Sequence, residues 1–146
     1  MEGRYKDMAK KVVIAGSVSL KEEIRKWVDF WTNEGQEVID YPEALDKETF
    51  FDVYPDMKRE FFKNVEETDI FFVVNEDKNG IEGYIGAETF AELVLALSQN
   101  LIHGKSIQIV LAKMPSEKIQ SIEEIKMWLE LGWIELLGER VLAKEC

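Results

Sequence analysis

The sequence predicts a single α/β domain in which a mostly parallel sheet of about five strands lies between layers of helices. Three observations lead to this expectation. Short β-branched runs alternate along the chain with longer segments of helical periodicity. Residues 70–74 are five consecutive apolar residues, a pattern typical of a strand covered on both faces. The chain has 146 residues without an internal repeat or linker, so we treat 1–146 as one domain, a three-layer sandwich.

Five short segments have strand character because they are rich in β-branched or aromatic residues and end at turn-forming residues. The second of them is closed by Pro42, and the third contains the apolar run 70–74. The expected strands are 11–17, 36–42, 69–75, 105–112 and 133–138. Because a helical segment separates each strand from the next, the strands are expected to run parallel.

Four segments between these strands have apolar residues at helical spacing. Ser19 with Glu22, and Ser121 with Glu124, match the S-x-x-E capping box that marks a helix start. Pro55 lies in an aromatic-rich stretch and predicts a loop there, followed by a helix. The expected helices are 19–35, about 56–67, a segment that follows the glycine-rich loop 76–83 and ends near 103, and 121–132.

The composition excludes several classes of function. Lysine and arginine total 18 against 29 aspartate and glutamate residues, and the resulting charge of −11 repels a nucleic-acid duplex. No apolar stretch reaches the ~18 residues of a membrane-spanning helix, and the N-terminus lacks the apolar region of a signal peptide, so we expect a cytoplasmic protein without membrane contact. One histidine, His103, and one cysteine, Cys146, argue against a metal site, and we expect no cofactor.

Three segments are expected to meet where ligands bind in such folds, outside the carboxyl ends of the strands. They are "AGSVS" after the first strand, "DYPEA" after the second and "NEDKNGIEGYIGAE" after the third. Ser17 could contact a ligand or allow close packing, and Ser19 could cap a helix, contact a ligand or do both. Asp40 and Tyr41 could face the same crevice or form a turn.

Two carboxylates, Glu88 and Glu92, stand at the start of the otherwise apolar helix that ends near 103. They could belong to a thin polar stripe on the surface. Alternatively, because so little of this helix is polar, they could face a wet cleft or a partner. Glu92 lies about one turn inside the helix, where a fixed carboxylate could act as a nucleophile, or as a counterion to the cationic transition state at a sugar anomeric carbon.

The chain resembles the nucleoside 2-deoxyribosyltransferase superfamily, which includes the 2′-deoxynucleoside 5′-phosphate N-hydrolases. The resemblance is carried by "VVIAGSVS", by "ETDIFFVVNED", and by "ETFAELVLA" followed by "GKSIQIVLA", in this order over about 11–112. The third stretch resembles the family motif G-T-x-x-E-L-x-x-A. This resemblance implies a flavodoxin-like, Rossmann-like fold. It also implies that a glutamate attacks C1′ of a nucleoside or nucleotide, with retention and without a cofactor.

The resemblance also implies roles for individual residues. Glu92 would be the nucleophile, Thr89 would match the family's threonine, and Asp77 would orient the nucleophile or protonate the leaving base. Glu88 stands where the family usually has glycine, so it could crowd the sugar pocket or supply a second carboxylate. Tyr84 could stack on a base or pack its own loop. The residues expected near the sugar or a 5′-phosphate are Gly16, Ser17 and Ser19.

The sequence is compatible with three classes of function. The first is an enzyme, a hydrolase or a transferase, acting on N-glycosidic bonds. The second is a catalytically inactive nucleotide-binding module of the same fold. The third is a structural or oligomer-forming protein, in which the four tryptophans could build a subunit interface: Trp27, Trp31, Trp128 and Trp133. The resemblance implies a homodimer, because family members often lend a residue to the neighbouring pocket.

Overall fold

The computed structural model of the protein describes residues 9–138, which form one α/β unit. Its elements are β1 (Lys11–Gly16), α2 (Lys21–Asn33), β2 (Glu37–Asp40), α3 (Phe50–Glu67), β3 (Ile70–Val74), α4 (Ala87–His103), β4 (Gln108–Leu111), α5 (Ile122–Glu130) and β5 (Glu135–Leu136). All five strands are parallel and lie in the order β2-β1-β3-β4-β5. The predicted class and the alternation of strands and helices are confirmed, with strands up to three residues shorter at either end than expected.

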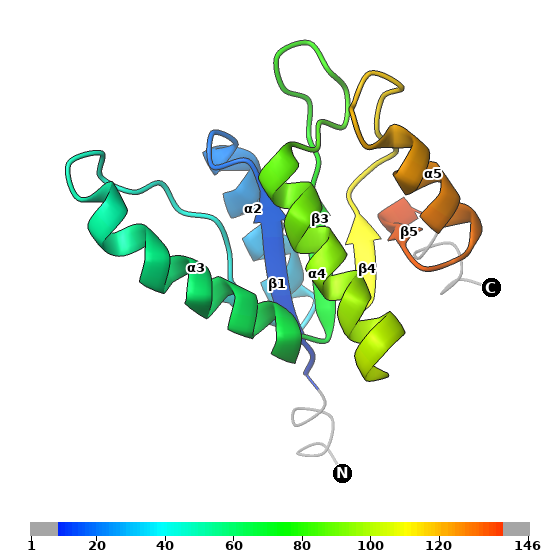
Figure 1. Cartoon of the computed structure of the whole chain (residues 1–146), viewed down its shortest axis with the longest axis horizontal. Helices are drawn as coiled ribbons and strands as arrows, with labels where there is room; N and C mark the ends of the chain where they lie inside the picture. Colours follow the sequence, from blue (N-terminus) through cyan, green and yellow to red (C-terminus); the bar gives the residue numbers. More distant parts are fainter. Residues whose placement is uncertain (1–8, 139–146) are drawn as a thin grey trace.

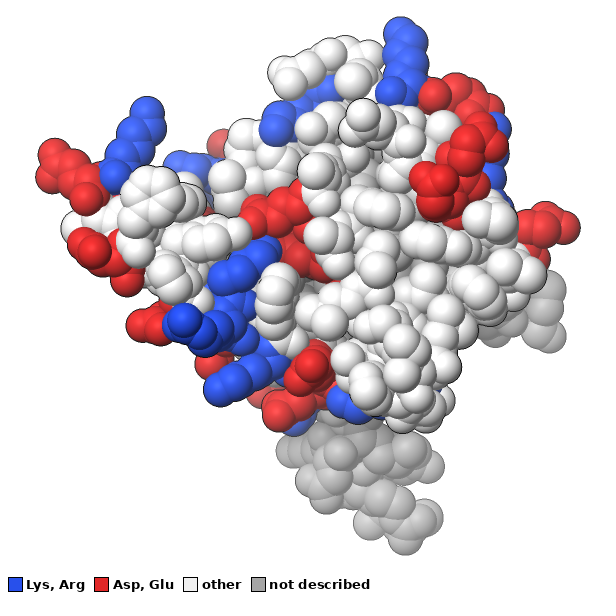
Figure 2. All heavy atoms as spheres, viewed as in Figure 1, with Lys and Arg blue, Asp and Glu red and all other residues white. Residues whose placement is uncertain are grey.

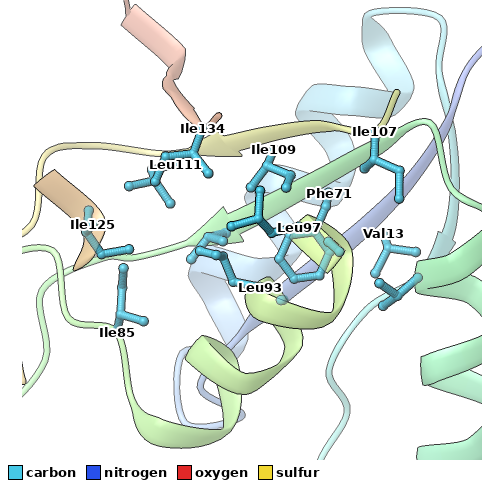
Figure 3. Close-up of a cluster of buried hydrophobic side chains, with 14 of the residues drawn as sticks. Val13, Phe71, Ile85, Leu93, Leu97, Ile107, Ile109, Leu111, Ile125 and Ile134 are labelled. Carbon is cyan, nitrogen blue, oxygen red and sulfur yellow. The ribbon is translucent and has the colours of Figure 1, made fainter. Parts of the chain in front are cut away.

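Helices cover both faces of the sheet, unequally: α3, α4 and α5 lie on one face and α2 on the other (Figure 1). The period-two alternation of strand side chains explains this division. Val13 and Phe71 point into the core beneath α3, α4 and α5 (Figure 3), whereas Val12 and Phe72 point into the core beneath α2. Within residues 9–138, no helix combines the length and the apolar content that crossing a membrane requires.

Helix α3 begins at Phe50, six residues before the predicted start, so the loop expected around Pro55 is wrong. Pro55 is the sixth residue of an 18-residue helix. A proline removes its own N–H and crowds the carbonyl four residues earlier, here that of Phe51 in the first turn. The disturbance is therefore confined to the exposed start of the helix. As a result, Tyr54 becomes part of the helix that faces α4.

Neither predicted capping box forms. In α2 the N-cap is Leu20, one residue later than the box requires, and in α5 the N-cap is Ser121, whose hydroxyl makes no capping bond. The ψ angles of these two residues are 47° and 15°, so neither has the extended backbone that aims an N-cap side chain at the helix amides. The hydroxyl of Ser19 instead lies 2.9 Å from that of Ser17.

The four tryptophan side chains do not lie together on one surface of the protein. Trp31 is 1% exposed in the core beneath α2, so the expectation that it lies at a subunit interface is wrong. Trp27 donates a hydrogen bond to Glu76 over 2.8 Å, and Trp128 stacks on Phe90. Trp133 is 39% exposed. The four tryptophans therefore do not form one interface, and the homodimer stays a prediction.

The loop after β3 packs against the loop after β4, which lies beside it in Figure 1. It turns sharply at Asn79 and Gly80, both with positive φ, in a two-residue hairpin turn closed by hydrogen bonds between Lys78 and Ile81. Gly83 has φ of 61°, and a Cβ there would lie 2.8 Å from the Met114 carbonyl oxygen. Contact between the two loops therefore depends on glycine at position 83.

Gly83→Ala is expected to lower the free energy of unfolding by about 2–4 kcal/mol, because it adds a steric clash to the cost of a left-handed alanine. Gly80→Ala is the matched control. Gly80 also has positive φ, but a Cβ there meets nothing within 4 Å. It is expected to cost about 1 kcal/mol. Urea unfolding followed by tryptophan fluorescence measures both. Equal losses in the two variants would show that the loop contact contributes nothing.

Candidate active site

A pocket at the carboxyl ends of β1 and β2 contains Glu92 from the second turn of α4. Glu92 is 7% exposed, and its carboxylate faces α3. The lining residues are Gly16, Val18, Asp40, Tyr41, Pro42, Glu43, Met57, Lys58, Phe61, Glu88 and Glu92. The pocket volume is about 70 Å³. Ligand sites usually reach roughly 300 Å³ or more, so a nucleoside requires this pocket to widen.

Helices α3 and α4 are joined at this pocket by a chain of polar contacts. The ammonium of Lys58 donates a hydrogen bond to Glu92 and lies 3.1 Å from Oε2 of Glu88. The hydroxyl of Tyr54 donates to the same Glu88 oxygen over 2.6 Å. Figure 2 shows acidic and basic side chains side by side in the hollow between α3 and the centre of the molecule. One ammonium therefore serves two carboxylates.

Burial and neighbouring carboxylates oppose ionisation of Glu92, whereas Lys58 favours it. Burial raises the pKa of Glu92, the hydrogen bond and charge of Lys58 act to lower it, and the charges of Glu88 and Asp40 raise it further. Burial also acts against the charge of Lys58, but the two carboxylates leave the pKa of Lys58 raised. For Glu88, the Tyr54 hydrogen bond lowers the pKa. The ammonium is therefore firmly protonated beside Glu92.

A second carboxyl group, that of Asp40, faces the same pocket from the end of β2. It accepts a hydrogen bond of 2.9 Å from the Asn64 side chain and one of 2.8 Å from the Tyr41 amide. Burial raises the pKa of Asp40 despite these two bonds. Burial raises the pKa values of Asp40 and Glu92 alike. What distinguishes the two carboxyl groups is the ammonium of Lys58, which pairs with Glu92 and favours its ionised form.

The structure brings three of the predicted site residues into this pocket: Gly16, Glu88 and Glu92. A Cβ on Gly16 would lie 3.1 Å from the Val74 carbonyl oxygen, so glycine allows the close approach of β1 and β3. Thr89 is buried on α4. The paired hydroxyls of Ser17 and Ser19 lie just before α2, and Ser17 accepts a hydrogen bond of 2.8 Å from Lys78.

Asp77 and Tyr84 lie outside this group. Asp77 accepts hydrogen bonds from Lys113 over 2.7 Å and from the Gly83 amide over 3.1 Å, and the contact with Lys113 lowers the pKa of Asp77. The ammonium of Lys78 lies over the ring of Tyr84, 5.1 Å from the ring centroid. Tyr84 lines a separate pocket. Neither residue lines the pocket of Glu92, and the roles expected for them stay predictions.

Sequence reasoning missed Lys58 and Tyr54, the two α3 residues that contact the glutamates. The loop predicted around Pro55 placed Tyr54 outside any helix, and nothing marked Lys58. A helical spacing was nevertheless present, because successive aromatic or apolar residues are four, seven and four positions apart: Phe50, Tyr54, Phe61 and Val65. This spacing could have identified the early start of α3 and the face that it turns toward α4.

Comparison of the chain with protein-family models, with curated proteins and with solved structures gives no match. Within residues 9–138, His, Cys, Asp and Glu side chains form no group of three or more that could hold a metal ion. The groups at hand are a buried carboxylate, an ammonium bound to it and a second carboxyl. Together they suit nucleophilic catalysis with proton transfer.

Proposed function

We propose that the protein cleaves the N-glycosidic bond of a nucleoside or nucleotide, with Glu92 as the nucleophile. The observation that supports this most is the burial of Glu92 at the carboxyl ends of the strands, beside the ammonium of Lys58 and the carboxyl of Asp40. Enzymes that cleave glycosidic bonds usually use two carboxyl groups that flank the bond. The resemblance of "ETFAELVLA" to a family motif selects the same glutamate independently.

The reaction proceeds in two balanced steps. A lone pair on Glu92 forms a bond to C1′ while the C1′–N bond breaks, and the leaving nitrogen keeps the bonding pair and takes a proton from a carboxylic acid. Water then gives a proton to that carboxylate and bonds to C1′, which releases Glu92 as a carboxylate. A second base in place of water makes the protein a transferase. Asp40 is the better placed acid, and Asp77 is the alternative.

A second candidate function is nucleotide binding without catalysis. It is favoured by the bond between Lys58 and Glu92, which reduces the charge available for attack, and by the small volume of the pocket, about 70 Å³. In that case Glu92 is a binding group, and the resemblance reflects the fold alone. Binding would then be measurable while no base is released.

A product assay tests the proposal. The protein is incubated with deoxynucleosides, deoxynucleoside 5′-monophosphates and their ribose counterparts, each with and without an acceptor base, and free base is measured by chromatography. We expect base release from at least one compound. An acid quench during turnover is expected to leave a pentosyl adduct on the peptide that contains Glu92, visible by mass spectrometry. Thermal stabilisation by these compounds with no release from any of them contradicts catalysis and supports the binding module.

A further inference from the structure

The ammonium of Lys58 is held in a largely enclosed position between α3 and α4. Its side chain is 17% exposed, it pairs with Glu92 and Glu88, and it lies 5.5 Å and 5.1 Å from the ring centroids of Phe61 and Phe62. A charge in such surroundings is costly unless it is paired. Lys58 is therefore held in place by its partners in the pocket, unlike the solvated lysines that are common on helix surfaces.

The charged residues that line the pocket with Glu92 come from α4, β2, the loop after β2 and α3, whereas β1 contributes only Gly16. Glu88 lies on the same helix as Glu92, Asp40 is at the end of β2, Glu43 is in the loop that follows, and Lys58 is on α3. Among the described residues that line the pocket, Lys58 is the one cation. Burial and the charges of Glu88 and Asp40 thus act against ionisation of Glu92, while a carboxylate nucleophile must be ionised to attack.

We propose that Lys58 is a positioning residue that keeps Glu92 ionised in the free protein, and that Glu88 takes over the ammonium while Glu92 is esterified. The inference rests on the proposed function for its second half only. Before attack, one ammonium faces two carboxylates. Once Glu92 is an uncharged ester, Lys58 and Glu88 remain as a neutral pair, with Glu88 fixed by Tyr54. A shift of Lys58 toward Glu88 also frees space beside Glu92 for the sugar.

The test measures ionisation without relying on activity. Protein labelled with ¹³C at glutamate carboxyls is titrated by NMR, and the Glu92 signal is assigned by its loss in Glu92→Gln. In Lys58→Met the midpoint is expected to rise by about one to three pH units, the usual effect of a close opposite charge. Lys63→Met, on the exposed side of α3, is the matched control and is expected to leave the midpoint unchanged. Glu88→Gln removes a like charge, so the midpoint is expected to fall.

A pH–rate profile supplies the second readout. If the wild type releases base, the acid limb of kcat/KM is expected to move upward in Lys58→Met by the same amount as the titration midpoint, and Lys58→Arg is expected to restore it. A midpoint that does not rise in folded Lys58→Met overturns the inference, even if base is released. A midpoint that moves as expected, with no base released from any compound, supports the ionisation role and contradicts the proposed function instead. Should Lys58→Met fail to fold, Lys58→Gln, which also removes the ammonium but keeps a polar side chain, is titrated in its place with the same expected rise.

Discussion

Glu92→Gln is expected to lower the turnover of a susceptible nucleoside by about four to six orders of magnitude, the scale on which enzymes lose activity with their covalent nucleophile. The amide has the shape of the carboxylate but no anionic lone pair to bond to C1′. The fold is expected to persist, because the ammonium of Lys58 keeps Glu88 as a partner at 3.1 Å. Base release measures turnover, and circular dichroism with urea unfolding checks the structure.

Glu130→Gln is a suitable control for this variant, because it makes the same chemical change on the exposed surface of α5. It is expected to leave turnover within a factor of about two and stability within about 0.5 kcal/mol. The pentosyl adduct expected in the wild type should be absent from Glu92→Gln and present in Glu130→Gln. Near-normal turnover in a folded Glu92→Gln protein would exclude Glu92 as the nucleophile.

Phe72→Ala is expected to lower the free energy of unfolding by about 3–5 kcal/mol, the cost of removing a large buried aromatic side chain. Phe72 lies in the central strand β3 and is 0% exposed. Its ring centroid is 4.7 Å from that of Trp27 and 5.3 Å from that of Trp31, so the change leaves a cavity and removes two aromatic contacts. Urea unfolding by circular dichroism gives the free energy.

Phe51→Ala provides the matched comparison for this loss. Phe51 is 86% exposed in the first turn of α3, and its removal is expected to cost less than about 1 kcal/mol. The difference between the two variants isolates the contribution of burial beneath α2. Similar losses in both would mean that the contacts between α2 and β3 contribute little to stability.

Patterns local to one segment predicted most of the fold. The apolar run 70–74 became β3, with all five side chains buried, and the alternating strand and helix segments became one parallel sheet. Two local predictions failed because the position of the residue in its helix outweighed its usual preference. Pro55 is tolerated because it falls near an exposed helix start, and Ser19 does not cap α2 because the helix begins one residue later than the capping box needs.

The candidate site could be predicted only in part. A charged residue in an otherwise apolar helix is easily recognised in a sequence, and Glu92 was identified in this way. Lys58 did not, because lysines on amphipathic helices are common and its partner lies 34 residues away. Their meeting depends on how α3 sits against α4. Asp40 could be predicted in part. Its place after β2 indicated the crevice, but the burial that raises its pKa and the Asn64 hydrogen bond that opposes this rise both depend on the tertiary structure.

The sheet order has a consequence for behaviour at high concentration. Within the described chain, the two outer strands are β2, with four residues, and β5, with two, and each begins with a glutamate. Short edge strands that carry acidic residues offer a neighbouring chain few backbone groups for pairing. Natural proteins discourage edge-to-edge aggregation in this way. The strands with the greatest tendency to assemble, β1 and β3, are shielded in the interior, so the folded chain is expected to resist fibril formation.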